Sequence, residues 1–319
     1  MTTSDPISSQ TTTSAKVVVI GSTNWDICLY LPHLPKPGET VGSGRLKTNL
    51  GGKGANQAIA CLKSGASTYF ISCIGNDNTG QEVLEQLQGL GLNTERVSQV
   101  ADTTGTACIF IDDNAENCIG LTPGANDHLS TELVTTHTEI IKDSAALLLQ
   151  LETPIETVVY AAQLAKSCNK PVILNPAPAR ELPANIFPYL SLITPNESEL
   201  NSLTGLPVES LEEITLAAKS LLDKGVAQVL VTLGEAGALL VNKNQVKQYT
   251  SYPVKALDTT AAGDTFNGYL ASQLAIDWDF DRAVPLACAA AALSVTKEGA
   301  IASIPDRETV EDFLASRKS

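Results

Sequence analysis

The segment KVVVIG, residues 16–21, is an uninterrupted apolar run that ends in glycine. A strand that alternates apolar and polar residues has one face in water, whereas a continuous apolar strand is buried on both faces. Such burial is typical of parallel sheets that helices cover on both sides. Further runs of this kind are STYFISCIG (67–75), AALLLQLE (145–152), PVILNP (171–176), SLITPN (191–196) and AQVLVTLG (227–234).

Helical patterns lie between these runs, in GANQAIACLKSG (54–65), TGQEVLEQLQGLG (79–91), IETVVYAAQLAKSC (155–168) and LEEITLAAKSLLDKG (211–225). Gly65 and Gly225 follow the last residue of the apolar period, a position where glycine commonly ends a helix. The alternation of buried strands and amphipathic helices predicts an α/β fold, with a mainly parallel central sheet sandwiched by helices.

Two segments interrupt this alternation. Residues 26–50 and 104–124 have strand-like composition without a helical period, and CIFIDDNAENCIGL predicts a hairpin that turns at 113–116. We expect a small β-sheet that forms a lid over a site or extends a sheet edge. Its apolar face would be covered by a second subunit, because exposed strand layers tend to be covered. The alternating apolar residues are Ile27, Leu29 and Leu31 on one strand, and Ile109 and Ile111 on another.

The other segments divide into a core and a tail. Residues 16–25, 51–103 and 125–319 would form one α/β core. Residues 1–15 are rich in Ser and Thr, which predicts a disordered N-terminal tail. A transit peptide for organellar import is the alternative, although the tail contains no arginine.

The overall charge limits the partners of the chain. Its 319 residues include 35 acidic and 21 basic ones, which gives a formal charge of −14. This charge argues against nucleic acid or an anionic membrane as the main partner, because both require a basic surface. The seven cysteines are scattered without a CxxC pair, which predicts reduced, buried thiols in a cytoplasmic protein.

Polar residues follow most of the predicted strands, at the edge where open parallel sheets bind ligands. Any one of them could be a helix cap, but several of them beside glycine-rich turns indicate a ligand site. The polar residues are Asn24, Asp26, Glu152, Asn175, Asn196, Glu197, Glu199 and Asp264, and the glycines Gly234 and Gly237 follow VLVTL.

The segment DTTAAGDTFNGYL (258–270) places three small residues directly before Asp264 and a helical period. The first turn of a helix has unpaired N–H groups and a partial positive charge, and small residues let a ligand approach the backbone. Residues 261–263 therefore suit a transferring phosphate, and Asp264 is placed to take a proton from the attacking group. The alternative is that Asp264 only caps a helix over 265–276.

A second glycine-rich turn, GGKGANQ (51–57), also leads into a helical pattern. It does not match a Walker A loop, and GSTNWD after the first strand does not match a dinucleotide-binding fingerprint. Lys53 and Asn56 could donate hydrogen bonds to a polar ligand, or the lysine could be solvated in a tight turn. Asn196 and Glu199 could order a hydrated Mg²⁺ near phosphates, or could be a helix cap with a first-turn glutamate.

With these segments the chain resembles the ribokinase/PfkB carbohydrate kinase family over about residues 16–317. Its two signatures are NLGGKGANQAIACLKSGA and DTTAAGDTFNGYL, and LNPAPAREL, LITPNESEL and VTLGEAGALL add further matches. The resemblance implies a mainly parallel sheet between helices and a β-lid over the sugar that often forms a dimer contact. It also implies phosphorylation of D-ribose at O5 by ATP, with Mg²⁺ and an activating monovalent cation, usually K⁺.

The resemblance assigns a role to each matching position. Asp264 would be the general base, and Ala261, Ala262 and Gly263 would form the anion hole. The sugar would contact Asn24, Asp26, Gly52, Lys53, Asn56, Glu152 and Asp264. ATP would contact Asn196, Thr232, Gly234, Glu235, Ala236, Gly237, Gly263 and Cys288, and Glu199 would act near Mg²⁺. The ligands of K⁺ would come from Asp258, Thr260, Ser294, Lys297, Gly299 and Ser303, largely through backbone carbonyls.

Two positions depart from the family pattern. Cys288 stands where a histidine near the adenine is frequent, and Lys297 where arginine is common. Two other functions also stay open: a kinase for deoxyribose or another small sugar or nucleoside, and a non-catalytic sugar sensor on the same fold. The presence of Asp264, Gly263 and the pair Asn196–Glu199 argues against the sensor, which would need none of them.

Overall fold

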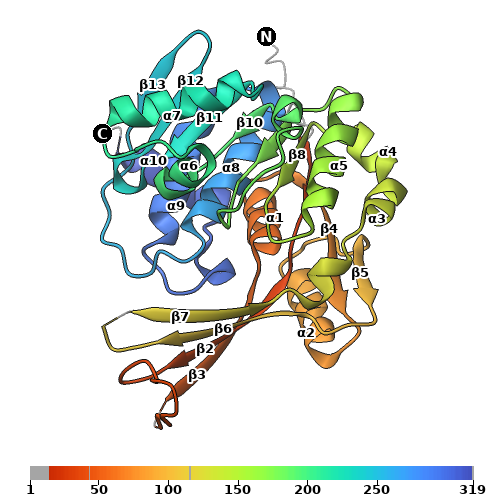
Figure 1. The fold of residues 1–319 in the computed structure, drawn as a ribbon, viewed down its shortest axis with the longest axis vertical. Helices are drawn as coiled ribbons and strands as arrows, with labels where there is room; N and C mark the ends of the chain where they lie inside the picture. Colours follow the sequence, from red (N-terminus) through yellow and green to blue (C-terminus); the bar gives the residue numbers. More distant parts are fainter. Residues whose placement is uncertain (1–13, 43, 115, 318–319) are drawn as a thin grey trace, which may run out of the picture.

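The computed structural model describes residues 14–42, 44–114 and 116–317 of the chain. Its largest element is a nine-stranded sheet in the order β13-β12-β11-β10-β9-β8-β1-β4-β5 (Figure 1). The strands are β1 (Lys16–Ile20), β4 (Ser67–Gly75), β5 (Val97–Val100), β8 (Ala146–Leu149), β9 (Val172–Leu174), β10 (Leu192–Ile193), β11 (Gln228–Thr232), β12 (Ala238–Asn242) and β13 (Val246–Tyr249).

The sheet is parallel from β5 through β11, and β12 and β13 are antiparallel additions at one edge. The six apolar runs of the sequence form β1, β4, β8, β9, β10 and β11, so the predicted fold class is confirmed. The pattern did not identify β5, β12 and β13. Both edge strands, β5 and β13, are only partly buried and therefore lack a continuous apolar run.

Helices cover both faces of this sheet. Successive residues of a strand point to opposite sides, so a strand in which every residue is apolar needs a helical layer on each side. Val17 and Val19 of β1 pack into one apolar cluster, and Val18 and Ile20 pack into the other. The first cluster involves α1 (Lys53–Lys63), α2 (Asn78–Gly89), α8 (Ala262–Asp277), α9 (Phe280–Ser294) and α10 (Arg307–Ser316). The second involves α3 (Thr131–Thr136), α4 (Thr138–Asp143), α5 (Ile155–Ser167), α6 (Glu197–Thr204) and α7 (Leu211–Asp223).

A second, four-stranded sheet extends from the body as a twisted ribbon, which we call the lid (Figure 1). Its order is β3-β2-β6-β7, with β2 and β6 parallel and the outer pairs antiparallel. The strands β2 (Asn24–Tyr30) and β3 (Arg45–Gly51) extend slightly beyond the segment 26–50. The strands β6 (Gly105–Ile111) and β7 (Asn117–Thr122) lie within 104–124, and the turn between them includes positions 113 and 116.

The apolar residues of the lid lie on both of its faces. Ile109 of β6 is in register with Cys28 of β2, whereas Ile27 is in register with Cys108. The set Ile109 and Ile111 therefore lies on the face opposite to Ile27 and Leu29. The expectation of one apolar lid face is therefore wrong. The register of β2 against β6 decides which residues share a face, and this register cannot be derived from the sequence pattern.

The seven cysteines are all free. Four of them are buried as predicted, but Cys108 and Cys118 are exposed and Cys168 is half-buried. The prediction of buried thiols is wrong for these three, because β6 and β7 belong to the projecting lid and Cys168 ends α5 at the surface.

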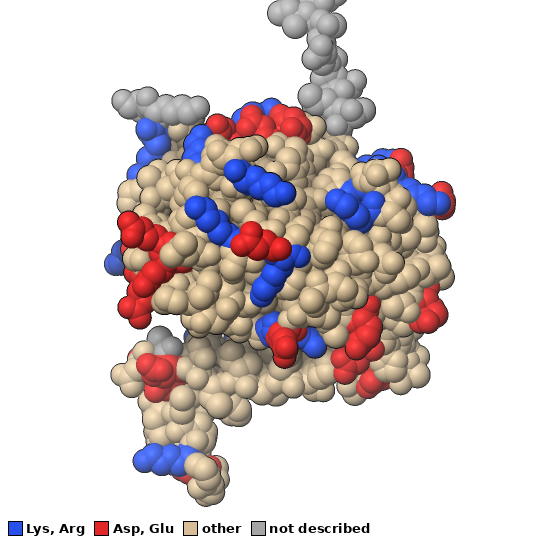
Figure 2. Space-filling model, turned by 45° about the horizontal axis from the view of Figure 1, so that its top comes forward, with Lys and Arg blue, Asp and Glu red and all other residues tan. Residues whose placement is uncertain are grey.

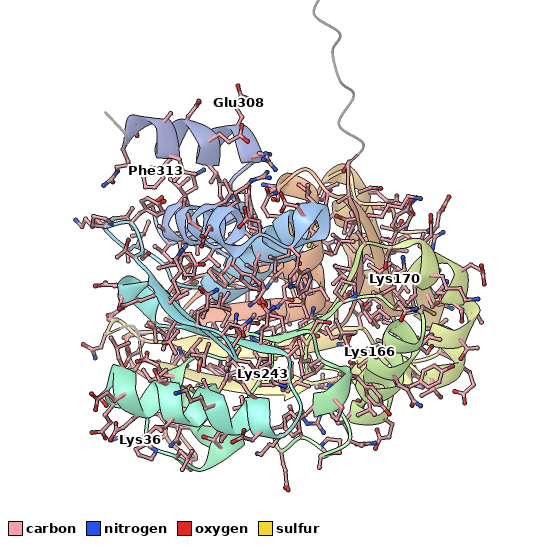
Figure 3. All side chains as sticks on the ribbon, turned by 90° about the horizontal axis from the view of Figure 1, so that it is seen from above. Lys36, Lys166, Lys170, Lys243, Glu308 and Phe313 are labelled. Atoms are coloured by element: carbon pink, nitrogen blue, oxygen red, sulfur yellow. The ribbon has the colours of Figure 1, made fainter. Side chains whose placement is uncertain are left out.

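The two ends of the described chain pack on the body. Most of the predicted tail lies outside the described residues, but Ser14 donates a hydrogen bond to the carbonyl of Gly65 at 2.6 Å. Near the other end, Phe313 of α10 packs edge-on against Tyr252 with ring centroids 5.6 Å apart, while Glu308 points outward (Figure 3).

Charged side chains of both signs are interspersed on the face of the molecule that Figure 2 shows. None of the helices in the described ranges is long and apolar enough to cross a bilayer.

Candidate active site

The two glycine-rich segments of the sequence meet because α1 and α8 pack closely together. Gly268 of α8 permits this approach, since a Cβ there would lie 2.4 Å from the Cβ of Ala60 and 2.7 Å from the carbonyl oxygen of Gln57. The close packing brings residues of α1 into hydrogen-bond distance of the first turn of α8.

Asp264 lies in that first turn and is only 6% exposed. Its Oδ1 accepts a hydrogen bond from Nε2 of Gln57 at 2.8 Å, and its Oδ2 accepts one from Nδ2 of Asn56 at 2.9 Å. The helix begins at Ala262, and no described side chain caps it. The alternative that Asp264 only caps a helix over 265–276 is therefore wrong, because its carboxylate is bonded to α1 instead.

The backbone before Asp264 is open on one side. Ala261 has a φ of 59°, in the left-handed region, and α8 starts directly after it. A helix has no carbonyl of its own for the N–H groups of its first turn. A Cβ placed on Gly263 would meet no atom within 4 Å, so a ligand could approach this backbone. An anion fits such a site, as the sequence predicts for residues 261–263.

The N-terminus of α1 holds the carboxylate of Glu152. Its Oε2 accepts hydrogen bonds from the backbone N–H of Lys53 at 2.9 Å and from the hydroxyl of Ser22 at 2.6 Å. The turn after β1 can approach this helix because Gly54 has no side chain: a Cβ there would lie 2.4 Å from the nitrogen of Ser22. Both bonds use Oε2, and Gly52, with φ 88°, forms the N-cap beside them.

Asn24 is buried at the start of β2, and its amide has a defined orientation. Its Oδ1 accepts a hydrogen bond from Nδ2 of Asn126 at 2.8 Å, while Oδ1 of Asn126 accepts one from the backbone of Thr23 at 2.8 Å. Asn126 therefore fixes which way both amides point, and the Nδ2 of Asn24 is left to donate to a ligand.

Several charged groups of the predicted site influence one another. Burial, followed by the negative charges of Glu152 and Asp264, raises the pKa of Asp26 to about 7. Burial lowers the pKa of Lys53, but the surrounding carboxylates outweigh this effect and hold the pKa above its ordinary value. The ammonium therefore stays charged among four carboxylates, one of which is Glu199.

Asn196 and Glu199 form a reciprocal cap at the start of α6. The backbone N–H of Glu199 donates to Oδ1 of Asn196 at 2.7 Å, and the backbone N–H of Asn196 donates to Oε2 of Glu199 at 2.9 Å. The capping interpretation of this pair is thus correct. It leaves Oε1 of Glu199 outside the cap, and burial raises the pKa of this carboxyl. The role of Glu199 near Mg²⁺ stays a prediction. A carboxylate oxygen close to the phosphates of ATP would suit it, because Mg²⁺ prefers oxygen ligands.

The predicted nucleotide loop follows β11. Thr232 pairs with Asn196 in an isolated bridge, and residues 234–236 form a 3₁₀ turn whose side chains are exposed. Gly237 closes this loop with φ 99°, and a Cβ there would lie 2.0 Å from the carbonyl oxygen of Tyr249. Cys288 of α9 belongs to the apolar cluster, where burial raises the pKa of its thiol to about 12.

The two segments assigned to a monovalent cation also come together. The carboxylate of Asp258 accepts hydrogen bonds from the backbone N–H groups of Thr260 at 2.9 Å and Gly299 at 2.8 Å. Burial raises its pKa, but these hydrogen bonds hold the pKa below its ordinary value. The backbone N–H of Lys297 donates to the carbonyl of Ser294, and the hydroxyl of Ser303 donates to the carbonyl of Ala300.

These groups offer oxygen atoms, which suit a hard cation such as K⁺. Within the described ranges, no group of three or more His, Cys, Asp or Glu side chains could hold a metal ion. A cation at residues 258–260 and 294–303 would therefore depend mainly on backbone carbonyls.

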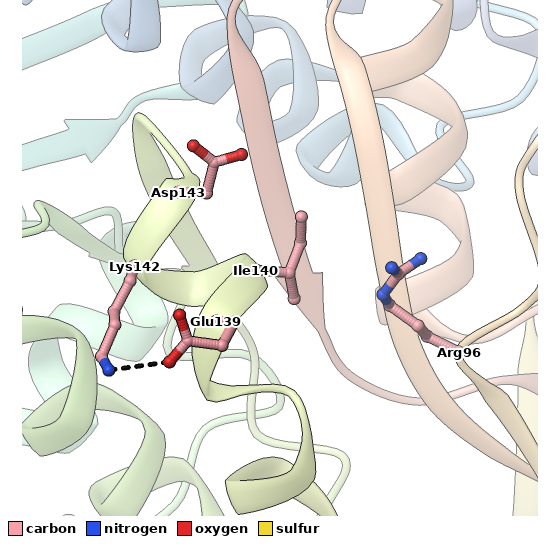
Figure 4. Close-up of a pocket in the computed structure, with 5 residues that line it drawn as sticks. All are labelled: Arg96, Glu139, Ile140, Lys142 and Asp143. Atoms are coloured by element: carbon pink, nitrogen blue, oxygen red, sulfur yellow. Dashed lines mark hydrogen bonds and ion pairs between the residues drawn. The ribbon is translucent and has the colours of Figure 1, made fainter.

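Figure 4 shows a surface hollow that lies apart from these residues. It is lined by Arg96, Glu139, Ile140, Lys142 and Asp143. Asp143 is paired with Lys16 at the amino end of β1, whereas the polar residues described above follow the carboxyl ends of the strands. The hollow is thus at the wrong edge of the sheet for this site.

Among the polar residues that the sequence analysis did not select are Gln57, Asn126 and Gln150. Each is at most 1% exposed. Gln57 directly follows Asn56 in the glycine-rich turn, and Gln150 interrupts the apolar run 145–152, so a polar residue at a position that must be buried was the available signal.

A family model described as pfkB family carbohydrate kinase matches residues 14–307. The chain belongs to this family. A ribokinase from Haemophilus influenzae is 42% identical over 299 residues, which cover 93% of this chain and 98% of that protein. A deoxyribokinase from Salmonella typhimurium is 38% identical over 301 residues, which cover 94% of this chain and 98% of that protein.

A solved structure described as Arabidopsis thaliana ribokinase complexed with ribose and ATP is similar in fold. The TM-score is 0.90 at 34% sequence identity, with 94% of this chain and 99% of that chain covered. This pfkB-family kinase therefore shares both its fold and nearly its full length with ribokinases, as the two sequence signatures predicted.

Proposed function

We propose that this carbohydrate kinase transfers the γ-phosphoryl group of ATP to O5 of D-ribose, giving D-ribose 5-phosphate and ADP. The observation that carries the proposal is the position of Asp264: a buried carboxylate, held by two amides, directly beside the open backbone of Gly263. Similarity to ribokinases over nearly the whole chain supports ribose as the sugar.

In the proposed reaction, Asp264 removes the proton from the primary hydroxyl of the sugar as O5 attacks the γ-phosphorus. A new O–P bond forms, the bond from this phosphorus to the β,γ-bridging oxygen breaks, and ADP leaves. The N–H groups of the first turn of α8 stabilise the charge on the phosphoryl oxygens. Mg²⁺ bound with ATP would neutralise phosphate charge close to Glu199.

Several groups are available to bind the sugar hydroxyls. The Oδ1 of Asn56 is buried without a hydrogen-bond partner among the described residues. Such an atom costs about 1–3 kcal/mol unless something donates to it, and a sugar hydroxyl would do so. Asn24 can donate through Nδ2, and Asp26, half-protonated near neutral pH, can either donate or accept.

Three further features belong to the proposal. A monovalent cation, K⁺ by the family resemblance, would bind at residues 258–260 and 294–303. The lid would pair with a second subunit, which would cover the exposed Ile119 and Leu121 on the face of the lid that also carries Ile109. The kinase would work in the cytoplasm, a prediction that rests on the scattered cysteines of the sequence.

A coupled assay that follows ADP formation tests the function, with D-ribose, 2-deoxy-D-ribose and no sugar as separate arms. The favoured result is ADP formation with ribose at a higher kcat/KM than with deoxyribose. A higher kcat/KM for deoxyribose would favour the activity of the Salmonella relative. Ribose binding by calorimetry without any ADP formation would instead indicate a sugar sensor.

A further inference from the structure

The carboxylate of Asp264 is held by a buried chain of side-chain amides that no sugar, nucleotide or cation contact requires. Gln57, in the second turn of α1, is fully buried, and it is the donor to Oδ1 of Asp264 at 2.8 Å. The same Nε2 donates to Oδ1 of Asn175 at 2.9 Å, at the carboxyl end of β9. An amide nitrogen has two hydrogens, so both donors of Gln57 are in use.

A second glutamine donates to the oxygen of this amide. Nε2 of Gln150, at the carboxyl end of β8, donates to Oε1 of Gln57 at 2.7 Å. If the amide of Gln57 were reversed, its oxygen would face the oxygens of Asp264 and Asn175, and its nitrogen would face a donor. The oxygens of Asp264, which can only accept when the carboxylate is ionised, therefore set the orientation of Gln57, and Gln150 donates to the amide oxygen that this orientation presents.

Gln150 itself fits in a space that a glycine provides. It is 1% exposed, and a Cβ on Gly21 would lie 1.9 Å from its Oε1. That oxygen has no hydrogen-bond partner among the described residues, so the fold retains a buried polar side chain here at a cost. A hydrophobic residue would fill the same volume without this cost, which indicates that the amide serves a purpose other than packing.

We propose that Gln57 is a positioning residue, which holds the carboxylate of Asp264 in the orientation that proton removal requires, and that Gln150 acts through Gln57 by donating a hydrogen bond to its amide oxygen. Each oxygen of Asp264 receives one amide hydrogen, from Gln57 or Asn56, and keeps a lone pair for the sugar hydroxyl. Without Gln57, only Asn56 restrains the carboxylate, which can then rotate away from the line of attack.

The chain of buried hydrogen bonds continues from Gln57 to Gly263, in the predicted anion hole at 261–263. Asn175 donates to the carbonyl of Thr194, whose hydroxyl donates to Oδ1 of Asn267 at 2.6 Å. The Nδ2 of Asn267 donates to the carbonyl of Gly263 at 2.8 Å. The base and the backbone beside it are thus held by one connected set of buried hydrogen bonds, which keeps their relative position constant.

The proposal rests on the proposed role of Asp264 as general base, and Gln57→Met tests it. Methionine keeps the length and volume of glutamine but has no N–H. Because a misplaced catalytic group costs up to about 10²-fold, we expect kcat to fall by about 10-fold to 10²-fold. The KM and the calorimetric Kd for ribose should stay within a factor of two, because Gln57 is placed to act on the base and not on the sugar.

The matched control is Gln273→Met, which removes another buried amide from the same helix pair. Gln273 is 4% exposed on α8 and donates to the hydroxyl of Ser64 at 3.4 Å, away from Asp264. This variant should lose stability without losing kcat. A variant Gln57→Glu keeps the side-chain shape and the acceptor for Gln150, but its carboxylate would repel Asp264, so its kcat should fall at least as far as that of Gln57→Met.

A double-mutant cycle tests the part of Gln150, which touches neither Asp264 nor a predicted ligand. Gln150→Met should lower kcat in the wild-type background and have no further effect in the Gln57→Met background, because its action passes through Gln57. If the Gln57 variants do not fold, the kcat of Gln150→Met alone still tests whether these buried amides affect turnover.

Three results would overturn the proposal: a kcat of Gln57→Met or Gln57→Glu near that of wild type, a rise in the Kd for ribose that accounts for the loss, or additive effects of the two glutamines. The variant Asp264→Asn, assayed in parallel, separates this failure from failure of the proposed function. If wild type does not turn over ribose, or Asp264→Asn stays active, the function or the base is wrong. If Asp264→Asn is inactive while Gln57→Met is fully active, only the positioning role is wrong.

Discussion

Asp264→Asn should nearly abolish turnover while leaving the protein folded. The amide of asparagine cannot take up a proton from a hydroxyl, and a positioned general base contributes about 10²-fold to 10⁴-fold to the rate. A loss of that size corresponds to about 3–5 kcal/mol in the activation free energy. Ribose and ATP should still bind, because the side chains of Asn24 and Asp26 and the loop at 232–237 are unchanged.

The effect on stability can be derived from the two hydrogen bonds. In Asp264→Asn, one oxygen becomes an NH₂ group, which faces a donor of either Asn56 or Gln57. One hydrogen bond is lost and a buried donor is left without an acceptor, which costs about 1–3 kcal/mol. Loss of this charge also removes the repulsion between Asp264 and Asp26 and the attraction between Asp264 and Lys53, two effects of opposite sign. We therefore expect the Tm to fall by several degrees, with the variant folded at the assay temperature.

The measurement combines kcat from the coupled assay, ribose affinity from calorimetry and Tm from thermal melts on one preparation. The control is Asp277→Asn, the same substitution at the last residue of α8, where the carboxylate is on the surface and pairs with Arg282. Its kcat should equal that of wild type. Turnover of Asp264→Asn within about threefold of wild type, far below the usual contribution of a general base, would falsify the assignment.

Three further predictions concern the surroundings of the site. The folded-state pKa of Asp26, about 7, lies above its ordinary value of 3.8, so its contribution to stability is present below pH 3.8 and is lost as the pH rises through 7. The Tm of Asp26→Asn relative to wild type should therefore increase between pH 5 and pH 8, and a constant difference would contradict the raised pKa. Turnover in buffer free of Na⁺ and K⁺ should rise when KCl is added, and less so in Asp258→Asn; equal rates with and without KCl would rule out the cation site. Light scattering at micromolar concentration should give the mass of a dimer. Ile119→Glu on the lid should dissociate this dimer, whereas the control Leu216→Glu, at a similarly exposed position on α7, should not. A fully active wild-type monomer would contradict the covering role of the second subunit.

The fold was largely predictable from the apolar pattern. The run 16–21 and the other continuous runs predict buried parallel strands because only a sheet covered on both faces can bury every residue of a strand. The strands β5 and β13 were not predicted, because an edge strand is partly exposed and its residues need not all be apolar. In the lid, alternation was visible on each strand, but the register of β2 against β6 decides which residues share a face.

The site was predictable in part. Asp264 follows a small-residue turn and Asn56 lies in a glycine-rich one, and both patterns are local in the sequence. The signal for Gln57 and Gln150 was weaker, since it consisted only of a polar residue at a position expected to be buried, and an isolated glutamine in a helix or at a strand end is also compatible with solvent. The interpretation of Asp264 as a cap was also consistent with the sequence, since a carboxylate at a helix start is stabilised there whichever way it points.

The sequence by itself therefore determined the six strands that are continuous apolar runs, the amphipathic helices between them and the two segments that open α1 and α8. These follow from period and turn chemistry, which act over a few residues. The tertiary structure decided which side chains meet: Asp264 and Asn56 are 208 residues apart in the chain, and their hydrogen bond exists because Gly268 lets the two helices pack closely. A hydrogen bond depends on distance and direction in space, and only the packing of the whole chain sets these for residues so far apart.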